Sequence, residues 1–598
     1  MGHPIVVAQF TVSSPWTAWA NLSAGLWYIN FNGVYPLIDA ELSEGLPTKA
    51  IEAAVGSVVY RGEDLLKAES LTELASAPSF YWNSQTLDLV VHFPAFNPPN
   101  ETTSVGIIYS VSHELYDSLE GFVFFPHMKD LPPTAQEKDR LFFKKIAISS
   151  WTMTLDNAGH DYDGMPEWGV YNKVVKYYIG RSDLAFSSFA PLKQGRIRDF
   201  SFENNEVVIN IQDLRAQLAT RVPTAYFSEE EYEDLAQKII GKKKPLAFGR
   251  LLDAEPICVN AESIAGPYEF LLADGDIAAI KSVDQVRVAN APITPLAIDL
   301  QKGTITLSSA HIKDGASFKD LRVDFQGYVD ETGTLIENPL NIISFLLSRF
   351  SNVPYTEEFY EMDEWSKEIQ DKPSVALYIA SPSELLSIIE RIMEATRGGF
   401  LIASDGRYTW RTPNYASRPK WNIQDTDWLY EPSVAFDTSE VLASVRVGYG
   451  KSQKEDEYRY VENLTKQKEV LRNFNLLDDE DFELILSDKE AAEKFAEDVM
   501  QLSHEPAILV SGRLPITYAG MQIGRNAQIQ VNRLVRGEFV HWLGEMRGEI
   551  LKVSPDALKG EVEVTVRVVP GIPEYVEAKL ASAVYGYGVY GVISYGEA

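Results

Sequence analysis

Hydrophobic and polar residues alternate along most of the chain, which is the pattern of β-strands with one buried face. Clear examples are residues 87–93 (LDLVVHF), 207–211 (VVINI), 303–307 (GTITL) and 562–568 (VEVTVRV). Short clusters of Gly, Pro, Asn and Asp separate these runs and predict turns, as at residues 94–99 (PAFNPP). The pattern therefore predicts a mainly β protein.

Four segments instead show the spacing of amphipathic helices. Residues 228–241 begin with a Ser-x-x-Glu capping box and end at a glycine, which predicts a helix between them. Further helices are predicted to begin at Asn338-Pro339, near Ser383 and at Ser487. The apolar residues assigned to the buried faces of the four helices are Tyr232, Leu235, Ile239, Leu340, Ile343, Leu347, Phe350, Leu386, Ile389, Met393, Ala491, Phe495, Val499 and Leu502.

Residues 400–410 (FLIASDGRYTW) predict a β-hairpin. Two alternating runs flank Asp405-Gly406, and an Asp-Gly pair is typical of a two-residue hairpin turn. The strand-rich and helix-rich stretches divide the chain into five predicted parts. These are a β-rich accessory N-terminal domain (1–135), a β region with one helix (136–335), an α/β domain (336–430), a second β region with one helix (431–575) and a Tyr/Gly-rich C-terminal extension (576–598).

The charge balance of the chain indicates which kinds of partner it can bind. The chain of 598 residues is 45% hydrophobic, which is enough for several packed cores. It carries 54 Lys and Arg against 85 Asp and Glu, a formal charge of −31. Proteins that grip nucleic acid need a basic surface to replace phosphate counterions, so stable DNA or RNA binding is not expected.

Cys258 is the only cysteine, so a disulfide framework within the chain and a multi-cysteine metal site are excluded. Its place in the run 256–259 (PICV) predicts a buried thiol. No run of 18 apolar residues predicts a membrane-spanning helix, and the first ten residues do not resemble a signal peptide. We therefore expect synthesis and folding in the cytoplasm and no stable membrane insertion.

Candidate chemical motifs are incomplete. The turn at Asp156, Asn157, Asp161 and Asp163-Gly164 is acidic, but its spacing fits a calcium loop poorly, and a solvated turn is the simpler interpretation. The eight histidines show no zinc-binding spacing, and residues 447–452 (VGYGKS) lack the first glycine of a phosphate loop. We therefore predict no catalytic, cofactor-binding or metal-binding residues, no cofactor and no enzymatic activity.

Five segments, taken in order, resemble the tail hub proteins of long-tailed bacteriophages. The segments are 57–65 (SVVYRGEDL) with 70–74 (SLTEL) and 79–83 (SFYWN); 142–157 (FFKKIAISSWTMTLDN); 213–218 (DLRAQL) with 222–224 (VPT), the predicted helix and 244–249 (KPLAFG); 338–343 (NPLNII) with the hairpin; and Glu505-Pro506 with 514–524 (LPITYAGMQIG). Each motif is weak alone, and their order along residues 55–570 carries the resemblance. The first 50 residues and the Tyr/Gly-rich extension match no such protein.

This resemblance implies a fold and a role. Hub proteins combine tube-like β-barrel domains with α/β inserts, so 136–335 and 431–575 would be the two hub barrel regions. Such proteins form homotrimers that close the distal end of the tail tube, at the baseplate or tail tip. They contact the distal tail protein ring, the tape-measure protein and a fibre or spike used in host attachment, and they form the channel for DNA ejection. The expected location is the virion, and DNA would pass an acidic ring without specific binding.

Two other functions remain open from the residues alone. A tail-associated enzyme that degrades glycans or peptidoglycan would need two carboxylates in a cleft, which the abundant acidic residues do not exclude. A β-rich adhesin that forms no ring is the other alternative. The aromatic residues of the N-terminal part, including Trp16, Trp19 and Trp27, would suit sugar binding if exposed, but most large aromatic residues belong to cores.

Overall fold

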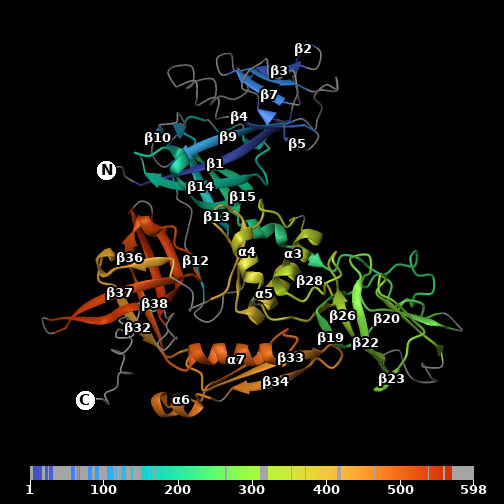
Figure 1. Ribbon diagram of the computed structural model, residues 1–598. Helices are drawn as coiled ribbons and strands as arrows, with labels where there is room; N and C mark the ends of the chain where they lie inside the picture. Colours follow the sequence, from blue (N-terminus) through green and yellow to red (C-terminus); the bar gives the residue numbers. More distant parts are fainter. Residues whose placement is uncertain are drawn as a thin grey trace.

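The computed structural model describes most of residues 150–568 and separate segments before residue 150 (Figure 1). The gaps after residue 150 are 161, 164, 168, 182, 263–265, 310–320, 352, 371, 414–418, 464, 536–537 and 557–558. The earlier described segments are 4–15, 20–23, 26–30, 55–60, 63–64, 66–67, 79–83, 88–92, 104–112, 116–117, 123–124, 126–129 and 136–138. Several predictions fall outside the described residues, namely the turn at 94–99, the segments 70–74 and 142–149, Trp16, Trp19 and the extension 576–598.

An eight-stranded sheet joins the N-terminal part to the next part of the chain. Its strand order is β13-β16-β15-β14-β1-β9-β4-β5, and β1 (Pro4–Pro15) pairs antiparallel with both β9 and β14. The sheet therefore has strands on both sides of residue 135, and the domain boundaries remain predictions. The other strands are β4 (Val55–Tyr60), β5 (Glu63–Asp64), β9 (Ser104–Ser112), β13 (Ser150–Asp156), β14 (Val174–Arg181), β15 (Ala190–Glu203) and β16 (Glu206–Gln212).

A smaller five-stranded sheet lies beside it, in the order β2-β3-β8-β7-β6. Its strands are β2 (Ala20–Ser23), β3 (Leu26–Asn30), β6 (Leu66–Lys67), β7 (Ser79–Asn83) and β8 (Asp88–His92). A separate pair is formed by β10 (Tyr116–Asp117) and β11 (Val123–Phe124).

Two sheets occupy the middle of the chain. One runs in the order β23-β22-β26-β19-β33-β34 with β35 beside β33, and the other in the order β20-β21-β25-β24. In the first sheet Leu252 pairs in parallel with Ser452, so segments 200 residues apart meet. The strands and the helices that follow them are β19 (Arg250–Ala254), β20 (Ile257–Cys258), β21 (Tyr268–Leu271), β22 (Ile280–Val288), β23 (Ala291–Ile293), β24 (Ala297–Asp299), β25 (Thr304–Leu307), β26 (Leu321–Tyr328), β33 (Ser444–Ser452), β34 (Glu457–Asn463), α6 (Gln467–Phe474), β35 (Asp479–Glu483) and α7 (Lys489–Ser503).

The α/β part holds three helices and three short strand pairs. The helices are α3 (Pro339–Phe350), α4 (Met362–Ile369) and α5 (Leu385–Thr396). The strand pairs are β17 (Arg221–Val222) with β28 (Ser383–Glu384), β18 (Leu246–Phe248) with β27 (Leu377–Ile379), and β29 (Gly399–Ile402) with β30 (Tyr408–Arg411). Among the described residues, the short 3₁₀ helices are η2 (Met165–Glu167), η3 (Phe186–Ser188), η4 (Leu214–Leu218), η7 (Asp425–Asp427) and η8 (Ile516–Tyr518).

The C-terminal sheet runs in the order β31-β37-β38-β39-β36-β32, and the distant strand β12 (Gln136–Glu137) pairs with β38. All four valines of β39 are fully buried, as the strict alternation predicts. The strands are β31 (Trp421–Ile423), β32 (Ser433–Asp437), β36 (Ala507–Pro515), β37 (Asn526–Val535), β38 (Glu538–Asp556) and β39 (Glu561–Val568).

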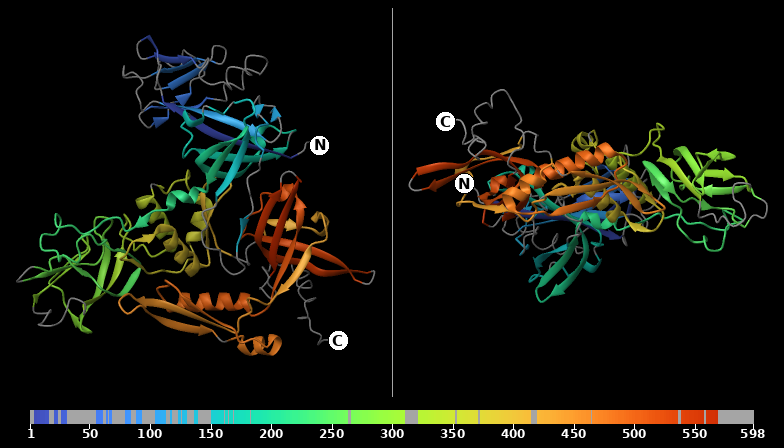
Figure 2. Two further views of the ribbon diagram at one scale, coloured as in Figure 1. Left: turned by 180° about the vertical axis from the view of Figure 1, so that it is seen from behind. Right: turned by 90° about the horizontal axis from the view of Figure 1, so that it is seen from below.

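The parts surround the α/β helices. Figures 1 and 2 show the C-terminal sheet and the sheet with β22 and β26 at opposite ends, with α3, α4 and α5 between them and α7 along one side. One apolar core reaches from Leu218 to Val568 and connects these parts. No helix in the described part of the chain has the length and apolar character needed to span a membrane.

The mainly β prediction is confirmed, and so are several individual elements. The side chain of Asn338 caps α3 by accepting the N–H groups of Leu340 and Asn341, and Leu340, Ile343 and Leu347 are buried. Helix α5 buries Leu386, Ile389 and Met393, and β29 and β30 form the predicted hairpin. The thiol of Cys258 is buried in β20.

The predicted helix at 228–241 is wrong. This segment is a series of turns, although Leu235 is buried and Tyr232 and Ile239 pack beside it as expected. The carboxylate of Glu231 lies 2.6 Å from Nζ of Lys244, so a tertiary ion pair takes the group that was expected to close the capping box. Local capping is a weak preference that such contacts override.

Two smaller predictions need correction. The hairpin loop holds three residues rather than two: Ile402 pairs with Tyr408, the N–H of Ala403 donates to the carbonyl oxygen of Arg407 at 2.8 Å, and Gly406 takes a left-handed conformation with φ +87°. This is the longer turn in which a glycine follows two helical residues. Helix α7 is capped by Asp488, not Ser487, since the Asp488 side chain accepts the N–H of Ala491.

Candidate functional site

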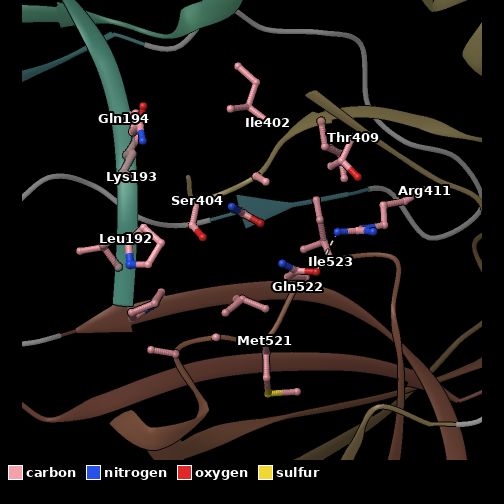
Figure 3. Close-up of a pocket in the computed structure, with 18 of the residues that line it drawn as sticks. Leu192, Lys193, Gln194, Ile402, Ser404, Thr409, Arg411, Met521, Gln522 and Ile523 are labelled. Carbon is pink, nitrogen blue, oxygen red and sulfur yellow. Dashed lines mark hydrogen bonds between the residues drawn. The ribbon is translucent and has the colours of Figure 1, made fainter. Parts of the chain in front are cut away.

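A cavity of about 420 Å³ lies where three parts of the molecule meet (Figure 3). Its walls come from the start of β15, from the β29–β30 hairpin and from the loop 519–523 after η8, with contributions from β12 and β38. Apolar side chains form much of the wall, including Leu192, Ile402, Met521 and Ile523. A cavity of this size falls within the range that holds small molecules or a few residues of a peptide.

One wall carries a network centred on Arg411. Its guanidinium lies 3.2 Å from Glu361 and 3.1 Å from Glu364, and it donates to Oε1 of Gln522 at 2.8 Å. Arg525 also pairs with Glu364. These bonds connect β30 and α4 with the chain that leads into β37 of the C-terminal sheet, so they fix the position of this wall.

The network also sets the ionisation of its groups. Burial opposes the charge of Glu364, but the hydrogen bond from Arg525 and the charges of Arg525 and Arg411 outweigh it, so the pKa of Glu364 is lowered. A general acid for glycoside cleavage needs a raised carboxyl pKa. The Glu361–Glu364 pair is therefore a structural pair held by arginine.

Strand alternation places Thr409 beside Arg411. Residues 408 and 410 pack into the core, and residues 409 and 411 line the cavity. The side chain of Thr409 is buried, and its hydroxyl finds no hydrogen-bond partner among the described residues. A buried hydroxyl without a partner is unfavourable, which marks this point of the wall as suited to a ligand.

The opposite wall is β15. The amide of Gln194 donates to the carbonyl oxygen of Asp405 at 2.6 Å and so links β15 to the hairpin. The ammonium of Lys193 lies 3.8 Å from the centre of the Trp151 ring. Burial lowers the pKa of Lys193 to about 8, because burial disfavours the charged amine.

A buried ion pair lies beside the cavity. Lys138, directly after β12, places Nζ 2.9 Å from Oε1 of Glu549 on β38, and neither side chain is exposed. The main-chain N–H of Lys138 donates to Leu551. Residues 136–138, which lie in the chain between β9 and β13 of the eight-stranded sheet, therefore attach this part of the chain to the C-terminal sheet.

The motifs considered from sequence lie elsewhere. In the acidic turn, Asn157 accepts the N–H of Tyr162 and donates to Asp163, while Asp156 pairs with Lys129; Asp161 and Gly164 lie outside the described residues. The side-chain bonds expected of a turn are present, although Asn157 itself is buried and not solvated. Residues 447–452 form the end of β33. Within the described residues, no group of three or more His, Cys, Asp or Glu side chains is arranged to hold a metal ion.

Sequence reasoning missed the cavity residues. The alternation at 408–411 identified a strand, but it gave no reason to single out Thr409 or Arg411. Gln522 is 111 residues from Arg411, and only the folded arrangement brings them together.

Comparison with known proteins gives similarity in structure only. No family model and no curated protein matches this sequence. A tail protein from Neisseria meningitidis is 9% identical, with a TM-score of 0.34 over 73% of this chain and 92% of that one. A chain in the virion of a native gene transfer agent is 12% identical, with a TM-score of 0.36 over 55% of this chain and 85% of that one. The 43 kDa tail protein of prophage MuSo2 from Shewanella oneidensis is 9% identical, with a TM-score of 0.32 over 75% of this chain and 96% of that one.

Proposed function

We propose that this chain is a structural virion protein of a bacteriophage, the hub at the distal tip of the tail. The observation that carries the proposal is where the hub-like segments lie. Residues from three of them, at 213–218, at the 400–410 hairpin and at 514–524, line one cavity although they are distant in sequence. These segments resemble one protein class in their order along the chain, and they also meet in the folded structure. Both facts together favour an architecture shared with that class over chance similarity.

In this role the protein acts through assembly and not as an enzyme. We expect a homotrimer that closes the tail tube at the baseplate or tail tip and contacts the distal tail ring, the tape-measure protein and a fibre or spike. Ring closure would cover strand edges such as β32 and β24, each paired on one side only among the described residues. A channel lined by acidic residues, in a chain with a net charge of −31, would repel DNA phosphate during ejection.

Electron microscopy tests the proposal. Negative-stain images of the purified chain at high concentration, alone and with the distal tail protein, should show threefold rings with a central channel. Antibodies against the chain should label intact virions at the distal end of the tail. Monomers in both preparations together with no label at the tail end would overturn the proposal, and cleavage of host glycan or peptidoglycan by the purified chain would replace it with the enzyme.

A further inference from the structure

The cavity runs along the edge of a strand. Five consecutive residues of β15, from Ala190 to Gln194, line it. Neighbouring side chains of a strand point to opposite faces, so a cavity lined by consecutive residues lies beside the edge of the strand. In this stretch β15 pairs, among the described residues, with β14 alone, because its pairing with β16 begins at Arg196.

The facing wall has the same character. Consecutive residues 400–404, which include most of β29, line the cavity, and β29 pairs with β30 on one side only in the described part of the chain. Two strand edges thus border one space. Unpaired edges expose backbone N–H and C=O groups that another extended chain can satisfy.

The polar groups that line the cavity are amides, hydroxyls and charged side chains, and the charged ones already have partners within the protein: Asp213 pairs with Arg215, and Lys193 lies over the Trp151 ring. Gln522 uses its oxygen to accept from Arg411, and Figure 3 shows its amide nitrogen turned away from Arg411. Gln194 uses its nitrogen on Asp405, which leaves its oxygen as an acceptor. The buried hydroxyl of Thr409 completes the set, and the guanidinium of Arg411 is already engaged by two carboxylates.

We propose that this cavity binds a short, uncharged, extended segment of a partner polypeptide, which adds as a strand beside β15. Side-chain amides match the donors and acceptors of a peptide backbone, and Leu192, Ile402 and Met521 offer apolar contacts to its side chains. The inference deepens the proposed function, since it identifies how a tail partner would attach. Peptide binding is measured on the isolated chain, so it can fail while assembly at the tail tip succeeds.

The probe is the blocked peptide acetyl-Val-Thr-Ile-Thr-Val-amide, with a version carrying proline at the central position as its control. Saturation-transfer NMR with the full chain should show binding of the first peptide and little binding of the second, because proline removes a backbone donor. Thr409→Val keeps the shape of the side chain and removes the hydroxyl, so affinity should fall roughly threefold to tenfold.

A pair of matched variants localises the binding. Ala519→Trp fills the cavity and should abolish binding, whereas Ala435→Trp makes the same change at an exposed position of β32 and should leave it intact. Equal circular dichroism spectra of the two variants would show that both fold. Failure of the wild-type chain to bind the probe, equal binding of the proline peptide, or binding that survives Ala519→Trp would each overturn the inference.

Discussion

Breaking the Lys138–Glu549 ion pair should loosen the contact between β12 and the C-terminal sheet. Both side chains are fully buried, so neither charge can regain its hydration if the partner is lost. Removing one partner of such a pair costs about 3–5 kcal/mol, whereas replacing both with apolar residues is close to neutral.

The surroundings predict which single change is worse. Burial lowers the pKa of Lys138, Glu549 acts in the opposite direction, and Arg567 and Arg397 add to the lowering. Glu549→Gln therefore leaves three cationic groups near one another, whereas Lys138→Met leaves a carboxylate that still has arginines nearby. We expect a loss of local stability of about 3 kcal/mol for Lys138→Met and a loss nearer about 5 kcal/mol for Glu549→Gln.

Hydrogen exchange measured by mass spectrometry reports the local stability of individual peptides, so it can follow the contact between β12 and β38 in a large chain with several sheets. At about 1.4 kcal/mol per tenfold, exchange in peptides covering 136–138 and 547–553 should accelerate from about 100-fold to several thousand-fold. Lys129→Met is the matched control. Its Nζ lies 2.8 Å from Glu206, a similar distance, but both side chains are about 40% exposed, so solvent screens the pair and its loss should leave the exchange rates nearly unchanged.

The double variant Lys138→Met/Glu549→Leu decides the argument. It should restore exchange to within about tenfold of the wild-type rate, because neither charge of the Lys138–Glu549 pair is then left buried without its partner. If the double variant exchanges faster than either single variant, burial of unpaired charge is not the origin of the effect and the reasoning is refuted.

Three further predictions concern other parts of the molecule. The Lys193 amine should titrate near pH 8 in NMR of ¹³C-methylated lysines, and titration near 10.5 would contradict this. Because its pKa is lowered from 10.5 on folding, the free energy of unfolding should rise as the pH increases from about 8 to 10.5 in the wild type but not in Lys193→Met. Gly398→Ala should lower the free energy of unfolding in urea by about 1–3 kcal/mol, because the added methyl group would overlap the buried Trp410 ring. In the control Gly520→Ala the methyl group would make only an ordinary contact with Trp421, so stability should not change. Equal effects of the two changes would exclude the overlap as the cause. Asn338→Ala should cost about 1–2 kcal/mol by the same measurement, and an unchanged midpoint would show that the cap of α3 contributes nothing.

The sequence predicted elements whose determinants are local. Helix α3 has its cap, its proline and its apolar face within one segment, and the alternation of β39 needs no distant partner to be recognised. The segment 228–241 carries equally good local signals and still forms turns, because Glu231 pairs with Lys244 and the apolar side chains pack around Phe227. The hairpin was predicted, but its loop length depends on the conformation of Gly406.

The cavity lay beyond sequence reasoning for a related reason. Each wall is an ordinary strand edge or loop, and its character arises only where β15, the hairpin and loop 519–523 face one another. The sequence showed in which order the hub-like segments follow one another, but it did not predict which of them contact one another in the folded chain. Pairings such as Arg411 with Gln522 depend on tertiary structure that no spacing rule encodes.

The walls of the cavity are held in different ways, and this bears on how a partner strand would enter. The hairpin wall and the C-terminal wall share one apolar core, which reaches from Leu218 to Val568, and the Arg411 network adds charge-assisted bonds between them. Within the described residues, that core includes no buried residue of β13 or β16, so the eight-stranded sheet packs as a separate unit. The bond from Gln194 to Asp405 and the attachment of residues 136–138 to β38 connect that unit to the rest. The hydrogen bond from Gln194 to Asp405 can be exchanged for a bond to a partner strand at little cost, whereas the buried Lys138–Glu549 pair and the shared apolar core cannot be opened without a large penalty. The β15 wall near Gln194 is therefore the one that would move to admit a strand.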